Sequence, residues 1–562
     1  MKRTSSLLGW ISFVLVFTNC NNNKKEPVAI DISSLQLKRG QLVSCGPADK
    51  QFGTVDLLTS CSPASKKDFS LALALLHSFE YDEAEKVFAK VIDEDPDCAM
   101  AYWGVAMSNF HALWAPPNEE ELKKGAKAVA IAMALPRKSE RELQYIEAIG
   151  AYFSGYETRP HGERTIAFEK AMEKVFTKYP GDKEAAAFYA LALDASASPN
   201  DKTYANQLKA GSILGNLYPN EPNHPGIVHY IIHTYDYPGL AERALPAARK
   251  YASVAPSSAH ALHMPTHIFT RLGLWEESIR SNKVSVEAAQ CYAASAGLKG
   301  HWDEELHGLD YLVYGFLQRG QVDSAKSLLK YLHSIQQVDP FNFKVAYAFA
   351  SIPSRIFLET RDWKAAASIQ PHIQNIDWKK YPWQEAILHY TRAMGLIHLG
   401  KMKEANFQID TLIALAQTLT GQKDPYKARQ VEVQVRTCQA WAKFENGDKE
   451  QGLKMMRLAA DIEDSTEKHP VTPGEVLPAR ELLGDMLMAD QQSGKALEAY
   501  ETSFLRSPNR FNGLSGAALA ARKAKQDDKA MTYYQKLVSI CASNGTARQK
   551  LKDAIAYLDA HK

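Results

Sequence analysis

Histidines gather in one window of the chain, between residues 224 and 310. Eight of the seventeen histidines fall there. Twice in this window a histidine is followed four residues later by another, a spacing that places both side chains on one helix face, with Cβ atoms about 5–6 Å apart. Imidazole nitrogens are ligands for zinc, copper, nickel and iron. The window therefore predicts a transition-metal site, with zinc, copper or iron as the expected ions, made of two pairs: His229 with His233, and His263 with His267.

Further polar residues could complete such a site. Aspartates can bind a metal, or can orient an imidazole by accepting its second proton. A proline-rich stretch, residues 469–475, could bring a histidine and a glutamate into the same space. We therefore expect a second group of residues to line the ligand groove: Asp236, His260, His307, Asp310, His224, His469 and Glu475.

Three interpretations of the histidines remain open at this stage. They could hold a metal, they could line a groove that binds a peptide or an anionic ligand without metal, or they could pack between helices with backbone and hydroxyl partners. Pro265 lies inside the second pair and either kinks that helix or begins it. Either case could separate His263 from His267.

The elements that position these residues follow a helical repeat. Residues 79–96 carry Ala84, Phe88 and Pro96 at the offsets of the second helix of a tetratricopeptide repeat, a helix pair of about 34 residues. The small residue lets two helices approach closely, the aromatic ring fills the gap to the next pair, and the proline ends the helix. Strand-like alternation is absent, so we predict an all-α tetratricopeptide-repeat α-solenoid of antiparallel helix pairs. Matching positions recur at 225–258, 259–292, 306–339, 386–419, 477–510 and 511–544.

The repeat register places both histidine pairs at the same positions of consecutive repeats. Their first members are at position 5 and their second members at position 9. In tetratricopeptide domains, positions 2, 5, 9 and 12 of the first helix face the concave groove in which ligands bind. Neighbouring helices pack about 8–10 Å apart, so the two pairs would meet as a four-imidazole patch. Four more residues take groove-facing positions and are expected at its edge: Asp236, His260, His307 and Asp310.

The N-terminus has the features of an export signal. Lys2 and Arg3 precede an apolar run, residues 7–17, that ends just before Cys20. This pattern is typical of a bacterial lipoprotein signal in which Cys20 becomes the lipidated residue; an ordinary signal cut near Cys20 is the alternative. We expect an exported protein, lipid-anchored to the cell envelope at the outer membrane. The predicted segments are a signal (1–20), a polar tether (21–43), a turn-rich segment (44–68), an N-terminal repeat array with the histidine-rich groove (69–345) and a C-terminal repeat array (346–562).

In an exported protein, cysteines can form stable disulfides. Cys45 and Cys61 lie in the turn-rich segment, and their short separation outside the cytoplasm predicts a disulfide between them. The remaining cysteines stand alone in helical patterns, without a Cys-x-x-Cys pair, and are expected to be small buried side chains. They are Cys98, Cys291, Cys438 and Cys541.

Charge and motifs narrow the possible partners. The formal net charge is +2, and no basic run is long enough to follow a phosphate backbone, so nucleic acid is not expected. The chain has no glycine-rich phosphate loop, no Gly-x-Ser-x-Gly elbow and no His-Glu-x-x-His motif. The expected partners are a protein, a peptide or a small ligand in the groove, and a membrane through the lipid anchor.

Two blocks carry a resemblance to a known family. One is His-Pro-Gly-x-x-His-Tyr-x-Ile-His, residues 224–233, and the other is Ala-His-x-x-His-Met-Pro-x-His-Ile, residues 259–268. At these residues the chain resembles uncharacterised bacterial tetratricopeptide-repeat proteins, many of them exported, and the likeness covers most of the mature chain. Some relatives have histidine where this chain has Asp310. The resemblance implies the repeat fold and brings no activity, substrate or metal.

These observations favour a lipid-anchored repeat scaffold that binds a ligand or partner in a His/Asp-lined groove. In one form of this hypothesis, a transition metal held by the histidines mediates the binding. A metal-dependent hydrolase or oxidoreductase that uses the same histidines is the first alternative. A lipoprotein that captures nutrients is the second, although the chain lacks the motifs known for that class.

Overall fold

The computed structural model describes residue 1 and, with short gaps, residues 32–561. Residues Leu37–Lys562 form one compact unit, and the short helix η1 (Ile32–Leu35) belongs to a separate unit, Met1–Gln36. Cys20, the predicted signal and most of the predicted tether lie outside the described residues, and the segment boundaries at residues 43, 68 and 345 remain predictions. The described residues are 1, 32–47, 49, 51–113, 116–199, 201–371, 376–541 and 548–561.

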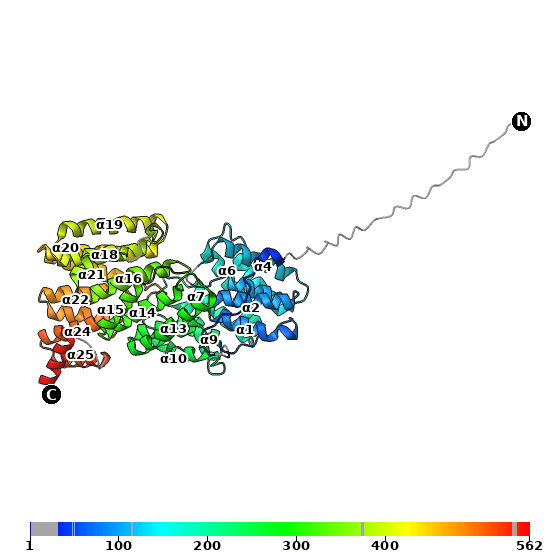
Figure 1. Ribbon diagram of the computed structural model, residues 1–562, viewed down its shortest axis with the longest axis horizontal. Helices are drawn as coiled ribbons and strands as arrows, with labels where there is room; N and C mark the ends of the chain where they lie inside the picture. The colour runs from blue at the N-terminus through cyan, green and yellow to red at the C-terminus, as the bar shows by residue number, and fades with distance from the viewer. Residues whose placement is uncertain are drawn as a thin grey trace. The chain divides into compact units, whose positions relative to one another are not determined.

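Helices make up the regular structure of the compact unit, and the described residues contain no β-strand. Consecutive helices pack against each other as pairs, and the first helices of successive pairs also contact one another, from α14 through α16, α18, α20 and α22 to α24. This two-layered arrangement confirms the predicted all-α tetratricopeptide-repeat solenoid. The colour sequence of Figure 1 follows the stack from α1 to the C-terminal helices.

The N-terminal helices begin at recognisable caps. Asn118 and Ser139 each form a capping box, in which the side chain accepts a backbone N–H and a glutamate three residues later reaches back. The helices of this part are η2 (Pro63–Ser65), α1 (Lys66–His77), α2 (Tyr81–Glu94), α3 (Ala99–Ser108), α4 (Glu119–Ala134), α5 (Glu140–Phe153), α6 (His161–Lys178), α7 (Lys183–Ser196) and α8 (Ala205–Leu217).

The central helices contain the histidine window. They are α9 (Pro225–Thr234), η3 (Ala241–Ala244), α10 (Leu245–Val254), α11 (Ala259–His263), α12 (Pro265–Leu272), α13 (Trp275–Ala296), α14 (Asp303–Gln318) and α15 (Val322–Leu332).

The C-terminal helices continue the stack. They are α16 (Phe343–Thr360), α17 (Trp363–Ala367), η4 (Trp378–Lys380), α18 (Pro382–His398), α19 (Met402–Gly421), α20 (Pro425–Glu445), α21 (Lys449–Asp464), α22 (Ala479–Ala489), α23 (Ser493–Ser503), α24 (Phe511–Lys523), α25 (Asp527–Ile540) and α26 (Gln549–Ala560).

The contacts within one repeat explain why small residues recur in the sequence pattern. Tyr500 of α23 is fully buried and packs against glycines of both flanking first helices. A Cβ added to Gly484 would lie 2.7 Å from the Tyr500 ring, and one added to Gly516 would lie 2.4 Å from it. The ring therefore needs two positions without side chains, one in each repeat, and this need explains the recurrent small residues.

The C-terminal array packs back onto the central helices. Helix α24 contacts α14 (Figure 1). Trp275 donates its indole N–H to the carbonyl of Asn509 at 2.6 Å, and the buried Arg510 donates to the Tyr314 hydroxyl at 2.8 Å. The segment between α21 and α22, residues 465–478, runs through the space between these elements and is called the inner loop below.

The cysteines pair differently from the prediction. Cys45 is bonded to Cys291 of α13, 246 residues away, and Cys61 is bonded to Cys98 at the start of α3. The predicted Cys45–Cys61 disulfide is therefore wrong. Cys98 is buried, as expected, but it is paired, and Cys291 is paired and exposed, so the expectation of a small buried side chain is wrong for Cys291. The physical reason is that the turn-rich segment runs along the helix stack, so its two cysteines meet different helices. Cys438 is free and buried, as expected, and Cys541 is free and partly buried.

Among the described residues, no helix combines the length and the apolar character that a bilayer crossing requires.

The glycine contacts give a stability prediction. We expect Gly516→Ala to lower the thermal unfolding midpoint, because its Cβ would overlap the Tyr500 ring and overpacking of this kind costs about 1–3 kcal/mol. Gly494→Ala is the matched control. Gly494 is also helical but has open space around it, so alanine there should be neutral or stabilising by about 0.5–1 kcal/mol. Equal midpoints for the two variants would contradict this account.

The disulfides give a second prediction. Peptide mapping of the unreduced protein should recover Cys45 linked to Cys291 and Cys61 linked to Cys98. The double variant Cys45→Ser/Cys291→Ser should unfold at a lower temperature, because closing a loop of this length stabilises the folded state by about 5 kcal/mol. Cys541→Ser, which removes a free thiol, should change the midpoint little. Recovery of a Cys45–Cys61 peptide would show that the pairing is wrong.

Candidate metal centre

Six histidines converge at the centre of the compact unit as two groups of three. They come from α9, from α11 with α12, and from α14. In each group, one ring nitrogen of every histidine lies within 4.8 Å of the others, which is the spacing of candidate metal ligands. The first triad is His229, His233 and His260, and the second triad is His263, His267 and His307.

The first triad is fixed from behind by the backbone of α1. The Nδ1–H of His229 donates to the carbonyl of His77 at 2.7 Å, which leaves the Nε2 lone pair of His229 facing the triad. The Nε2 atoms of His229 and His233 are 3.0 Å apart. The ring of His260 lies 5.1 Å from that of His229. Phe79, which has a left-handed backbone with φ of 58°, covers this group with its ring 4.5 Å from the His229 ring.

The second triad is fixed by two side-chain acceptors. The Nδ1–H of His263 donates to Asn282 Oδ1 at 2.7 Å, and Asn282 turns this oxygen toward the ring because its Nδ2 donates to the Ser278 carbonyl at 3.0 Å. The Nδ1–H of His267 donates to the carboxylate of Asp236 at 3.1 Å. The two Nε2 atoms that remain, one from each ring, are 3.2 Å apart. Each ring therefore donates its Nδ1 proton to an acceptor on its outer side. The two Nε2 lone pairs face each other.

Two lone pairs at this distance repel unless a cation lies between them. Burial lowers the pKa of His263 well below the usual range, and it lowers the pKa of His267 although Asp236 acts in the opposite direction. A shared proton is therefore disfavoured at neutral pH. Two nitrogens at about 2.0–2.1 Å from a tetrahedral metal are about 3.3 Å apart, which matches the observed separations of 3.0 Å and 3.2 Å. The residues present fit a transition metal.

The two triads adjoin each other. The rings of His233 and His267, one from each triad, are 6.3 Å apart. The ring of Tyr311 lies 4.7 Å from that of His263 and 5.3 Å from that of His267. Paired metal sites in proteins hold their ions about 3.5–4 Å apart, so two neighbouring triads have the composition of such a site.

Pro265 does not separate the second pair. Helix α11 ends at His263 and α12 begins at Pro265, but Met264 between them keeps helical backbone angles. Its N–H donates to the His260 carbonyl at 2.9 Å. The chain therefore continues in the same direction, and His263 and His267 stay on one face.

Asp236 joins the centre to the inner loop. Its carboxylate accepts from His267, from Arg271 Nε at 2.8 Å and from Lys468 Nζ at 3.0 Å, and all four groups are buried. Burial alone would raise the pKa of Asp236, but the charges of Lys468 and Arg271 hold it well below its usual value. The predicted role of Asp236 as an acceptor for an imidazole thus matches its geometry.

Two of the predicted groove residues lie in other clusters. Asp310 accepts from Ser351 at 2.9 Å and from the buried Arg355 at 2.9 Å. His224 caps the start of α9 by accepting the N–H of Ile227, and its Nε2 contacts Glu184 at 2.9 Å. Neither residue belongs to a triad, because each is fixed by its own partners.

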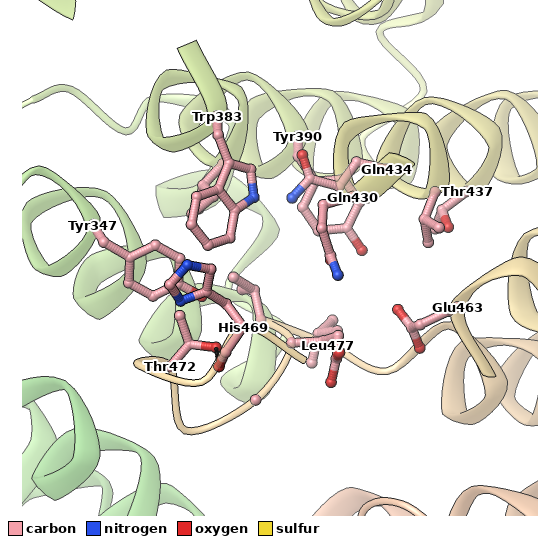
Figure 2. A pocket seen from close by; sticks show the side chains of 15 residues that line it. Tyr347, Trp383, Tyr390, Gln430, Gln434, Thr437, Glu463, His469, Thr472 and Leu477 are labelled. Atoms are coloured by element: carbon pink, nitrogen blue, oxygen red, sulfur yellow. Dashed lines mark hydrogen bonds between the residues drawn. The ribbon is translucent and has the colours of Figure 1, made fainter. Parts of the chain in front are cut away.

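The inner loop places the last two predicted residues. Figure 2 shows His469 beside Tyr347 and Trp383, with the rings of Trp383 and His469 5.3 Å apart. His469 and Glu475 line a cavity of about 40 Å³, room for only a few water molecules. The loop is held by Arg355, which donates to the carbonyls of Gly474 and Glu475, both at 2.8 Å. The expected open groove is thus covered beside the histidines by the chain itself, and His469 and Glu475 are not members of the triads.

Several residues of the centre were missed by sequence reasoning. The carbonyl of His77 leaves no trace in a sequence pattern. Asn282 could have been noticed as a polar residue on the buried face of α13. Arg271 and Lys468 carry charges that only the tertiary contact with Asp236 explains.

No protein-family model and no curated protein matches the chain. Among solved structures, the chain is similar to one described as "Structure of Naa15/Naa10 bound to HypK-THB", with 12% identity and a TM-score of 0.25 over 88% of this chain and 91% of the other. It is also similar to one described as "Human IFIT1 dimer with m7Gppp-AAAA", with 12% identity and a TM-score of 0.34 over 79% of this chain and 90% of the other. At these scores the likeness bears on neither ligand nor partner. The expectation that nucleic acid is not bound remains a prediction.

The contacts of the inner loop give a further prediction. We expect Arg355→Met to destabilise the protein by about 3–5 kcal/mol, because it leaves the buried Asp310 carboxylate without its cationic partner. It should also speed proteolytic cleavage within residues 465–478. Arg436→Met removes a partly exposed pair with Glu432 on one helix and should cost at most about 1 kcal/mol. Unfolding midpoints and limited proteolysis measure both effects, and similar results for the two variants would argue against this role of Arg355.

Proposed function

We propose that this chain binds transition-metal ions in its two histidine triads, inside a scaffold of tetratricopeptide-type helix pairs. The observation that carries the proposal is the pair of Nε2 lone pairs of His263 and His267, 3.2 Å apart with both Nδ1 protons donated outward. Acceptors behind ligating histidines are the usual second layer of a metal site, where they fix the tautomer and the ring orientation. The first triad repeats this arrangement at His229.

Zinc, copper and iron are the ions that the donor set favours, because imidazole nitrogens suit all three. Each triad supplies three protein ligands. A metal with three protein ligands keeps a coordination position for water or for a small ligand, which distinguishes it from closed four-ligand structural sites. The site therefore suits the binding of a further molecule.

This last point supports a second candidate function, a metal-dependent hydrolase or oxidoreductase. Adjacent three-histidine sites would allow two ions to share one substrate. The chain's own contribution would be to hold six neutral imidazoles in place and, through Phe79 and the inner loop, to limit the access of water.

We also propose that the protein is exported and lipid-anchored through Cys20. The two disulfides support this location, because disulfides persist in oxidising compartments outside the cytoplasm. The two histidine blocks support membership of the exported tetratricopeptide-repeat family that the sequence resembles. Because the inner loop covers the inner face beside the triads, a protein or peptide partner would bind elsewhere on the scaffold.

Metal analysis of the protein purified without an affinity tag tests the main proposal. We expect up to two equivalents of a transition metal under replete conditions. His263→Ala/His267→Ala and His229→Ala/His233→Ala should each lose about one equivalent, because each double variant dismantles one triad. His301→Ala, in the same window but outside both triads, should keep both ions.

Circular dichroism of each variant separates loss of metal from loss of fold. A wild-type protein that is folded and retains no metal under replete conditions would show that the proposal is wrong.

A further inference from the structure

A cavity of about 360 Å³ lies beside the first triad. Its wall includes residues from the ends of α7 and α9, from α8 and α12, and from the inner loop. His233 and Asp236 form part of this wall, so a molecule in the cavity would lie next to the triads. The volume lies in the range of small-molecule sites, whereas the 40 Å³ cavity beside His469 does not.

Two buried cations share one carboxylate on this wall. Arg271 donates from Nε to Oδ1 of Asp236 at 2.8 Å, and Lys468 donates from Nζ to Oδ2 at 3.0 Å. The two cationic side chains line the cavity and are 6% and 5% exposed. Burial lowers the pKa of Lys468 to about 8, against the effect of Asp236, so the amine is mostly protonated at neutral pH. Two positive charges and one negative charge leave one positive charge unmatched, in a place where little water can solvate it.

Both cations keep donors that their contacts with Asp236 do not use. A guanidinium has five N–H groups, and Arg271 uses its Nε and Nη2 toward the carboxylate and the carbonyl of Asp236. An ammonium has three, and Lys468 uses one of them. Within the described part of the chain, Nη1 of Arg271 and the other two hydrogens of Lys468 have no acceptor. Charged donors of this kind form their strongest hydrogen bonds with anions.

The other acidic residues of the wall do not cancel this charge. Glu467 has cations of its own, Lys202 at 3.2 Å and Arg506 at 3.1 Å, and Lys202 is 44% exposed, so water solvates it. Burial raises the pKa of Asp194 to about 8, so its carboxyl is mostly protonated at neutral pH. Asp201 accepts from backbone N–H groups at the start of α8. The unmatched charge therefore stays at Arg271 and Lys468.

The rest of the wall suits an apolar or aromatic body. The rings of Tyr204 and Tyr237 lie 4.8 Å apart and both line the cavity. Leu113, Ala195 and Pro470 add apolar surface. A few charged groups in a largely apolar and aromatic wall are the usual composition of a small-molecule site.

We infer that this cavity binds a small monocarboxylate, whose carboxylate accepts from Arg271 and Lys468 and whose apolar body lies against the two tyrosine rings. The single unmatched charge favours a monoanion, whereas a phosphate ester carries about 1.5–2 negative charges at pH 7. That the carboxylate also meets a metal ion beside His233 rests on the proposed function; the cavity and its cations do not.

The test is calorimetric titration of the full mature chain, as purified, with three probes of one shape. Benzoate is the monocarboxylate, benzamide is its uncharged counterpart, and phenyl phosphate carries the larger charge. We expect benzoate to bind with one site per chain, and benzamide and phenyl phosphate to bind at least tenfold more weakly.

Two lysine variants locate the site. Lys468→Met should weaken benzoate binding at least tenfold, because it removes the unmatched charge. The variant should fold, because Asp236 keeps Arg271 as its partner. Lys202→Met is the matched control: Lys202 also shares a carboxylate with an arginine, but it is exposed, and benzoate binding should stay within about threefold of wild type. Lys468→Gln, which keeps a donor for Asp236 without the charge, should weaken binding as Lys468→Met does. Circular dichroism confirms that each variant is folded.

The outcomes separate the two proposals. Metal binding without benzoate binding overturns this inference and leaves the proposed function intact. Benzoate binding that depends on Lys468, in a folded protein that takes up no metal under replete conditions, supports the inference and overturns the proposed function. Benzamide or phenyl phosphate binding as tightly as benzoate, or equal effects of Lys468→Met and Lys202→Met, overturns the inference.

Discussion

The carboxylate of Asp236 is the contact on which the centre of this molecule depends. Three groups from two parts of the chain donate to it: His267 of the second triad and Arg271 one turn further along the same helix, α12, and Lys468 in the inner loop. A buried carboxylate is tolerated only when its charge is matched and its oxygens are hydrogen-bonded. The contacts of this one carboxylate therefore orient an imidazole, neutralise the buried charge and attach the inner loop.

The inner loop covers part of the inner face of the helix array. An array of helix pairs ordinarily leaves its inner face open. Here Lys468 reaches Asp236, and Arg355 holds the loop through the carbonyls of Gly474 and Glu475. The return of α24 onto α14 brings the C-terminal array against the central helices. The histidines consequently lie in a buried chamber in which desolvation keeps them neutral, and neutral imidazoles are the form that binds metal.

Hydrogen bonds orient several of the imidazoles in this chamber. Around the triads, hydrogen bonds fix the outward nitrogens of His229, His263 and His267, which leaves the Nε2 lone pairs of these three rings facing inward. His263 and His267 thus bring two Nε2 lone pairs to within 3.2 Å of each other in the interior. A protein interior rarely leaves such groups unmatched without a ligand.

The sequence by itself determined the local features. Helix pairs, their register and the two pairs at four-residue spacing follow from periodicity, which depends on residues close together in the chain, and Tyr500 between its two glycines obeys the same pattern. The tertiary structure decided everything that joins distant residues. It divided the expected four-imidazole patch into two triads by adding His260 and His307, and it supplied Asn282 behind His263. It also paired Cys45 with Cys291 and brought Lys468 to Asp236 across 232 positions of the chain. The physical reason is that such contacts depend on how whole helices stack and return, and helical periodicity carries no record of which distant side chains will meet.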